Sequence, residues 1–215
     1  MTAEDLAYQK IIHLILEGHY KPGDFLLETE LAQNLGMSRT PIGRATGRLV
    51  AEGFLSRMPK KGCFIPYPTP QDSEQVFMAR ISIEGQAAAF AAKNATDEEI
   101  RELELILKPE IEALNRLDKD ITAQINRQFH SGIAKASHNA YIESWATKIF
   151  WRSNLYIFYF DSFYHMNRRD EIPAQKTPVQ HKAILDAMKE RSPELAEQRM
   201  REHIQTTFEK LMFGL

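Results

Sequence analysis

The chain has 215 residues, of which 43% are hydrophobic and 26% are charged, and its formal net charge is -2. This length suits one large domain or two small ones, and the composition is that of a globular protein. The charge gives no global indication of a nucleic-acid partner, and the single cysteine, Cys63, excludes an intrachain disulfide. Because the N-terminus lacks an apolar signal core and the aromatic stretch 145–164 is interrupted by charges, we expect a cytoplasmic protein with no membrane segment.

Basic residues are concentrated in one short segment of the chain. Residues 29–66 contain six lysines and arginines but only two glutamates, although the whole chain is slightly acidic. A small DNA-binding module within an acidic protein produces this kind of charge distribution.

The first part of the chain predicts a winged helix-turn-helix. In that arrangement the third helix presents its N-terminal residues to the major groove of DNA, and a basic hairpin contacts the backbone or the minor groove. A helical cap with a solvated basic face explains the same spacing equally well. The expected elements, in chain order, are helices over 4–17, 28–35 and 39–52, a short strand at 25–27, and a hairpin formed by 54–58 and 63–67.

The third predicted helix has a favourable start but contains two residues that lower its stability. Ser38 is suited to cap its start and Pro41 to fit its first turn. Gly43 and Gly47, however, lie inside it, and each costs about 1 kcal/mol relative to alanine.

Three prolines in residues 66–70 predict a domain boundary, and everything after them is expected to be helical. We expect Asp72 or Ser73 to open the first helix, Thr96 and Glu99 to form a capping box, and Pro109 to interrupt the helix that follows. The predicted fold is therefore mainly α: a winged helix-turn-helix domain over 4–68 and an all-α bundle over 72–212. Further helices are expected at 120–137, 140–163 and 178–190, with a last one from Ser192-Pro193 and a polar loop from His165 to Pro178.

Three of the seven histidines fall at positions where they can converge. His181 and His203 are about equally far from the turn near residue 191, so antiparallel helices would place them level. Asn126 and His130 are four residues apart, on one face of another helix. Three neutral imidazoles with one side-chain oxygen suit Zn²⁺ or a similar divalent ion. Each histidine taken alone is more often structural or on the surface.

Arg80 is the main candidate for an anion-binding residue in the bundle. It shares a helical stripe with apolar residues, so we expect it to point inward, where a guanidinium needs an anion. Glu84, one turn later, can satisfy that need, or it can orient Arg80 toward a ligand carboxylate. Arg152, within an aromatic helix expected to be mostly core, is a weaker second anchor.

The segment PGDFLLETELAQNLGMSRTPIGRATGRLVAEGFLSRMPKKGCFI resembles the winged-helix domain of GntR-type transcriptional regulators. The resemblance extends over most of residues 6–66 and implies double-stranded DNA, with a palindromic operator, as the partner. The DNA-binding residues that the layout and the resemblance indicate are Glu28, Ser38, Arg39, Thr40, Pro41, Arg44, Arg48, Lys60, Lys61 and Gly62.

The chain departs from the family pattern in the recognition helix. Where the family has V-R-E-A-L, this sequence has Ile42 to Thr46, so a base-reading arginine is replaced by Gly43 and Arg44 takes the place of an acidic residue. We hypothesise that the helix reads a shifted or relaxed site through Arg39 with Arg44 or Arg48. Weaker DNA binding is the alternative.

INRQFHSGIAKASHNAYI and HKAILDAMKERSPELAEQRMREHI resemble two segments of the FCD ligand-binding domain, and the two domains together resemble the FadR subfamily. That family binds a divalent metal through Asp, His, His and His, which correspond here to Asn126, His130, His181 and His203. The amide of Asn126 carries no charge, so we expect this site to bind a metal ion more weakly than a site with aspartate. Zinc is the expected metal, and nickel and manganese are alternatives. The resemblance also implies Arg80 as a ligand-binding residue.

The sequence therefore predicts a homodimeric transcriptional regulator, not an enzyme, that represses until a small organic acid binds at the metal. A metal-dependent hydrolase using the three histidines is the alternative function. The sequence has no HExxH motif, and Glu84 is the only nearby carboxylate that could act as a general base. In a third interpretation the protein binds DNA and the metal site is purely structural.

Overall fold

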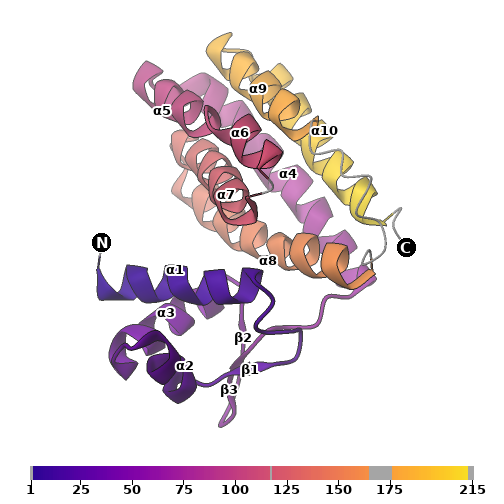
Figure 1. The fold of residues 1–215 in the computed structure, drawn as a ribbon. Helices are drawn as coiled ribbons and strands as arrows, with labels where there is room; N and C mark the ends of the chain where they lie inside the picture. The colour runs from indigo at the N-terminus through magenta and orange to yellow at the C-terminus, as the bar shows by residue number, and fades with distance from the viewer. Residues whose placement is uncertain (1, 117, 165–175, 213–215) are drawn as a thin grey trace.

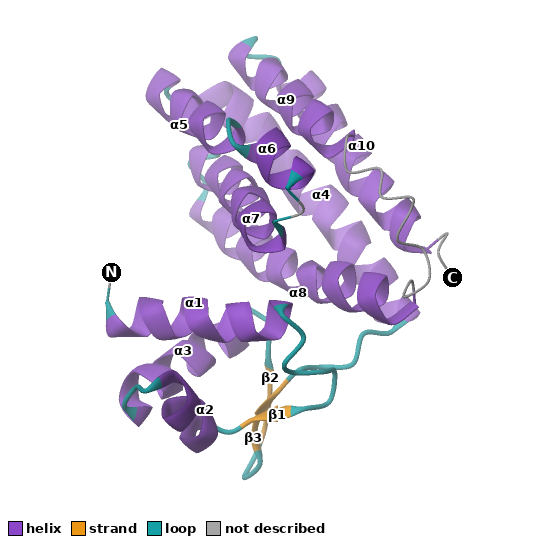
Figure 2. Ribbon diagram, in the orientation of Figure 1, coloured by secondary structure: helices purple, strands orange, loops and turns teal. Residues whose placement is uncertain are grey.

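The computed structural model describes residues 2–116, 118–164 and 176–212. It has a small N-terminal module and a larger helical domain (Figure 1). The mainly α architecture, with an N-terminal winged helix-turn-helix and a C-terminal all-α domain, is confirmed (Figure 2). The N-terminal elements are α1 (Ala3–Leu16), β1 (Phe25–Leu26), α2 (Glu28–Leu35), α3 (Arg39–Ala51), β2 (Ser56–Met58) and β3 (Gly62–Phe64). The helical domain contains α4 (Pro70–Asn94), α5 (Asp97–Leu107), α6 (Glu110–Asn115), α7 (Lys119–Ala136), α8 (Ala140–Tyr164), α9 (Lys176–Lys189) and α10 (Pro193–Met212).

The three short strands form one antiparallel sheet with the order β1-β3-β2. Phe64 pairs with Phe25 on one side and with Ser56 on the other, so β3 joins the start of the module to the hairpin. Lys60 and Gly62 have positive φ values of 66° and 107° at the hairpin tip. At Gly62 this conformation has no steric cost, because glycine lacks a Cβ, and it allows the tight turn of the β2–β3 hairpin, which forms the wing.

Local capping signals were predicted with mixed success. The capping box of Thr96 and Glu99 is confirmed at the start of α5. The expected opening of α4 at Asp72 or Ser73 is wrong, because Thr69 is the N-cap and Pro70 follows at the first helical position. Proline is favoured there because it has no N–H to leave unsatisfied and its φ is already helical.

Helix α4 lies at the centre of the helical domain and packs against α7, α8, α9 and α10. Its closely spaced alanines are almost fully buried, and small side chains allow neighbouring helices to approach closely. The buried alanines of α4 are Ala87, Ala88, Ala91 and Ala92.

Helix α8 also belongs to the core of the N-terminal module. Trp151 packs edge-on against Tyr8 of α1 and against Phe54, with ring centroids 6.1 and 5.3 Å apart. Leu155 joins the same cluster, so the two domains share buried apolar surface. The aromatic residues of this helix were expected to be mostly core, and Phe150, Trp151 and Tyr156 are buried, but Trp145 is 56% exposed.

Helix α9 begins at Lys176, two residues earlier than expected. Residues 165–175 of the predicted polar loop, including His165 and Pro173, lie outside the described residues, and the last three residues of that loop belong to α9. No helix in the described part of the chain is long and apolar enough to cross a membrane.

Replacing Gly47 by alanine is expected to stabilise the N-terminal module by about 1 kcal/mol, because glycine in a helix interior is worse than alanine by that amount. A Cβ built on Gly47 meets no atom within 4 Å, so no contact opposes the gain. Urea unfolding would measure the change. The matched control is Gly43→Ala, whose Cβ would lie 3.2 Å from Glu28 Oε2 and should gain less. An unchanged stability in Gly47→Ala would contradict this account.

Candidate metal centre and nucleic-acid interface

Three buried histidines from three helices meet inside the helical domain. His130 comes from α7, His181 from α9 and His203 from α10, and none is more than 4% exposed. The ring centroids of His181 and His203 are 4.7 Å apart, and those of His130 lie 5.3 Å from His203 and 5.5 Å from His181. One nitrogen from each ring can be chosen so that all three lie within 4.8 Å of one another. The expected level placement of His181 and His203 is confirmed.

Each imidazole has an oxygen partner behind it. Nδ1 of His130 lies 2.5 Å from Glu84 Oε2, Nδ1 of His181 lies 2.6 Å from Glu110 Oε1, and Nδ1 of His203 lies 3.1 Å from Gln180 Oε1. A carboxylate at Nδ1 holds the proton there and leaves the lone pair of Nε2 available for a metal. Sequence reasoning missed Glu110 and Gln180, and it treated Glu84 as a partner of Arg80 or a general base rather than as the partner of His130.

Nε2 of His130 and Nε2 of His181 are buried and have no hydrogen-bond partner among the residues that the structure describes. Buried polar atoms are nearly always satisfied, so two such nitrogens in one cluster point to a missing partner. Nitrogen ligands with carboxylates behind them fit a borderline divalent ion such as Zn²⁺. The residues present therefore fit the expected metal.

Charge in the cluster is balanced by Arg80. Burial alone would raise the pKa of Glu84, but Arg80 and His130 together lower it to about 2, so the carboxylate stays ionised. Burial lowers the pKa of His130, which Glu84 only partly offsets, so the imidazole is neutral as a metal ligand requires.

Arg80 points into the bundle as expected and is 2% exposed. Its Nε donates to Glu84 Oε1 at 2.5 Å and its Nη2 to Glu84 Oε2 at 3.3 Å, so both oxygens of Glu84 are engaged. Arg152 donates to Asp72 Oδ2 at 2.6 Å. Both arginines thus have carboxylate partners within the chain, and their binding of a ligand stays a prediction.

Asn126 lies on α7 one turn before His130 and is half-buried. Its role as the fourth metal ligand stays a prediction. A cavity of about 20 Å³ adjoins the cluster, with Glu84, Arg127, His130 and Phe150 among its lining residues. This volume holds a water molecule and no organic acid.

The start of α3 is exposed. Ser38 occupies the N-cap position but its side chain makes no capping hydrogen bond, so the hydroxyl and the free N–H groups of the first turn are available to a phosphate. Arg39, Thr40 and Arg44 are exposed, and so are Lys60 to Gly62 at the tip of the wing. These residues lie where the helix-turn-helix arrangement requires its DNA contacts.

Arg48 differs from the other basic residues of α3. Its Nε donates to Glu52 at 2.9 Å, Asp5 lies 3.4 Å from Nη1, and the guanidinium covers the ring of Tyr8 at 4.2 Å. The side chain therefore contacts α1, and its binding of DNA stays a prediction. Glu28 is half-buried beside Gly43.

The fold and the two sites define a class of protein: a winged-helix DNA-binding module joined to a helical domain that contains a cluster of three buried histidines. Two family models match the chain, the FCD domain over residues 75–206 and the bacterial regulatory proteins of the gntR family over residues 4–65. The protein belongs to the GntR family of transcriptional regulators and contains an FCD domain. Both resemblances predicted from the sequence are thereby confirmed. This membership assigns it to regulators and not to enzymes.

Relatives agree with this assignment. The HTH-type transcriptional regulator YdhC of Bacillus subtilis is 27% identical over 209 residues, which cover 95% of this chain and 88% of YdhC. An Escherichia coli protein provisionally named the L-lactate dehydrogenase operon regulatory protein is 33% identical, over 52% of this chain and 49% of its own. The structure of E. coli McbR/YncC matches with a TM-score of 0.80 at 23% identity and covers 99% of this chain and 98% of that one.

Proposed function

We propose that this regulator is a homodimeric repressor that is released from a palindromic operator by a small organic acid. The acid binds at a divalent metal ion held by His130, His181 and His203, with Asn126 as the fourth ligand. The observation that carries the proposal is the pair of buried, unpartnered Nε2 atoms backed by carboxylates. Zn²⁺ fits these ligands best, and Ni²⁺ and Mn²⁺ are alternatives.

A metal ion in this cluster supplies an open coordination position for a carboxylate oxygen of the effector. Because the adjoining cavity is only about 20 Å³, the acid must displace side chains or helices to enter. Such a ligand changes the DNA-binding state only if it binds the two arrangements with different affinity. One relative is named as a regulator of the L-lactate dehydrogenase operon, and this name supports an organic acid as the effector. The alignment with that relative covers 52% of this chain and 49% of the relative.

The test is to incubate the purified protein with fragments of its own genome at moderate salt and to sequence those that are retained. One palindrome should be enriched, and organic acids, L-lactate among them, should be screened for release of the labelled fragment with and without zinc. Enrichment without release by any acid would favour a structural metal site. No enrichment over bulk DNA under any condition would contradict the proposed DNA recognition.

Replacing Gly43 by arginine is expected to change the sequence that the protein recovers in this selection. We propose that Arg39 and Arg44 read the operator, so a restored arginine would add a guanine contact worth about 1–3 kcal/mol at a new position. The new Cβ meets only the flexible end of Glu28, which can move aside or pair with the guanidinium. Gly47→Ala is the control and should recover the wild-type operator. Tighter binding to that same operator would instead indicate a simple loss of affinity in this chain.

A further inference from the structure

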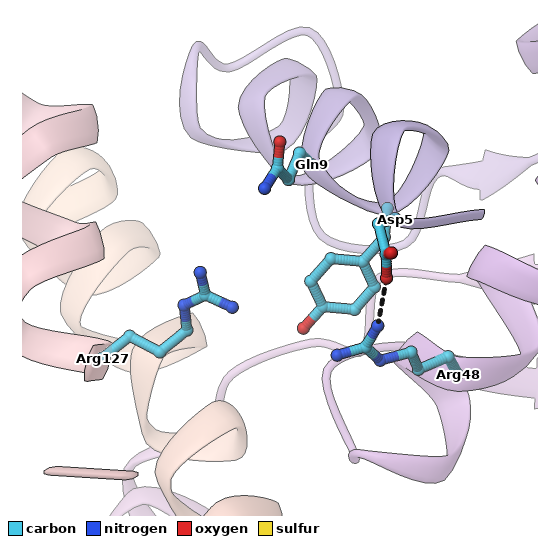
Figure 3. A pocket seen from close by; sticks show the side chains of 5 residues that line it. Asp5, Gln9, Arg48 and Arg127 are labelled. Atoms are coloured by element: carbon cyan, nitrogen blue, oxygen red, sulfur yellow. Dashed lines mark hydrogen bonds and ion pairs between the residues drawn. The ribbon is translucent and has the colours of Figure 1, made fainter. Parts of the chain in front are cut away.

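A second polar cavity lies between the two domains, apart from the histidine cluster. It has a volume of about 220 Å³ and is lined by Asp5, Tyr8 and Gln9 of α1, Arg48 of α3 and Arg127 of α7 (Figure 3). In Figure 3 the side chain of Arg127 extends from the helical domain toward the residues of the N-terminal module. Drug-sized ligands occupy about 300–1,000 Å³, so this space suits a compact molecule.

The two guanidiniums in this cavity are unequally neutralised. Arg48 has Glu52 at 2.9 Å and Asp5 at 3.4 Å. Arg127 pairs with no carboxylate among the described residues, and its guanidinium lies 5.6 Å from the ring centroid of Trp151. Arg48 is thus neutralised within the N-terminal module, whereas Arg127 brings a positive charge without a carboxylate partner in the described part of the chain to the wall of the cavity, where it can attract an anion.

Neighbouring contacts hold the Arg48 side of the cavity in place. The hydroxyl of Tyr8 donates to Glu52 Oε2 at 2.6 Å, and burial together with Glu52 raises the pKa of Tyr8, so the hydroxyl remains a neutral donor. Asp5 is 43% exposed in its side chain and its contact with Arg48 is long, so an anion can replace it at little cost.

We propose that this cavity binds a compact anion, held by Arg127 of the helical domain and by Arg48 of the N-terminal module, where the anion takes the place of Asp5. Phosphate and short di- or tricarboxylates share this chemistry. Because the two arginines belong to different domains, the bound anion stabilises the domain arrangement described above over any other. Arg127 also lines the small cavity beside His130, so one side chain borders both the anion site and the cavity next to the histidine cluster.

The test uses the full-length protein, stripped of metal by chelation so that the histidine cluster cannot contribute. It carries Trp145→Phe, which leaves Trp151, beside Arg127 and Tyr8, as the remaining tryptophan. Inorganic phosphate, malonate and citrate are titrated at constant ionic strength with chloride as the reference. Trp151 fluorescence and the melting temperature are both followed. A saturable response to phosphate alone, or to the carboxylates alone, identifies the source of the anion.

Arg127→Met should weaken the binding by about tenfold or more, since a hydrogen bond to a charged group contributes about 1.5–3 kcal/mol. Asp5→Asn should tighten it, because the competing carboxylate is removed. Arg101→Met, an exposed arginine of α5 paired with Glu98, is the matched control and should leave the titration unchanged. The proposal is overturned if no anion produces a saturable change in either signal, or if Arg127→Met binds as well as its parent. Because the assay contains neither DNA nor metal, its failure would leave the proposed function untouched.

Discussion

Replacing Glu84 by glutamine is expected to lower the free energy of unfolding of the helical domain by about 3–5 kcal/mol, the cost of breaking a buried ion pair on one side. The Glu84 carboxylate is 2% exposed and lies 2.5 Å from both Arg80 Nε and His130 Nδ1. An amide carries no charge, so the buried guanidinium of Arg80 would keep a neutral acceptor and the rings of Phe77 and Phe150 but would lose its counter-ion. Urea unfolding followed by circular dichroism measures the loss.

A double variant separates the contribution of the Arg80–Glu84 ion pair to stability from other contributions of Glu84. Arg80→Met combined with Glu84→Gln removes both charges and should recover much of the lost stability, because buried pairs are often replaced by apolar groups at little cost. The matched control is Glu98→Gln, which breaks the exposed pair with Arg101 and should have no measurable effect. A double variant as unstable as Glu84→Gln would show that the unpaired arginine is not the cause.

The sequence predicted best those features that depend on residues close together in the chain. The capping box joins Thr96 to Glu99, three positions later, and the level placement of His181 and His203 follows from similar distances to one turn. Ser38 shows the limit of such reasoning, since it sits at the N-cap of α3 without making the side-chain bond. Thr69 could not be recognised as the cap of α4, because the prolines on either side of it equally fit a boundary between domains.

Features that depend on tertiary packing could not be predicted from the sequence. Glu110 contacts His181 from 71 residues away, on a six-residue helix with no motif of its own. Trp151 looked like one more core aromatic of α8, and only the packing of α8 against α1 places it in the N-terminal core. Arg127 was not singled out because nothing in its own segment indicates an interdomain cavity.

Replacing His181 by glutamine is expected to abolish the stabilisation that zinc gives to the protein. A ligand at about 100 times its dissociation constant contributes about 2.7 kcal/mol, which corresponds to a rise of about 5–10 °C in the melting temperature of a chain this long. The wild type should show that rise after chelation and reloading with zinc. Glutamine keeps a donor for the buried Glu110 but removes the imidazole, so the rise should disappear even if the metal-free protein is itself less stable.

His19→Gln is the matched control, because His19 is 58% exposed in its side chain and far from the cluster in sequence, and its zinc response should equal that of the wild type. An undiminished rise in His181→Gln would place the metal elsewhere and would overturn the proposed centre. Asn126→Asp examines the fourth ligand, since a charged carboxylate in place of the amide should increase the rise at the same zinc concentration. If that variant responds as the wild type does, Asn126 does not coordinate the ion, and the three histidines are the described residues that hold it, with Glu84, Glu110 and Gln180 behind them.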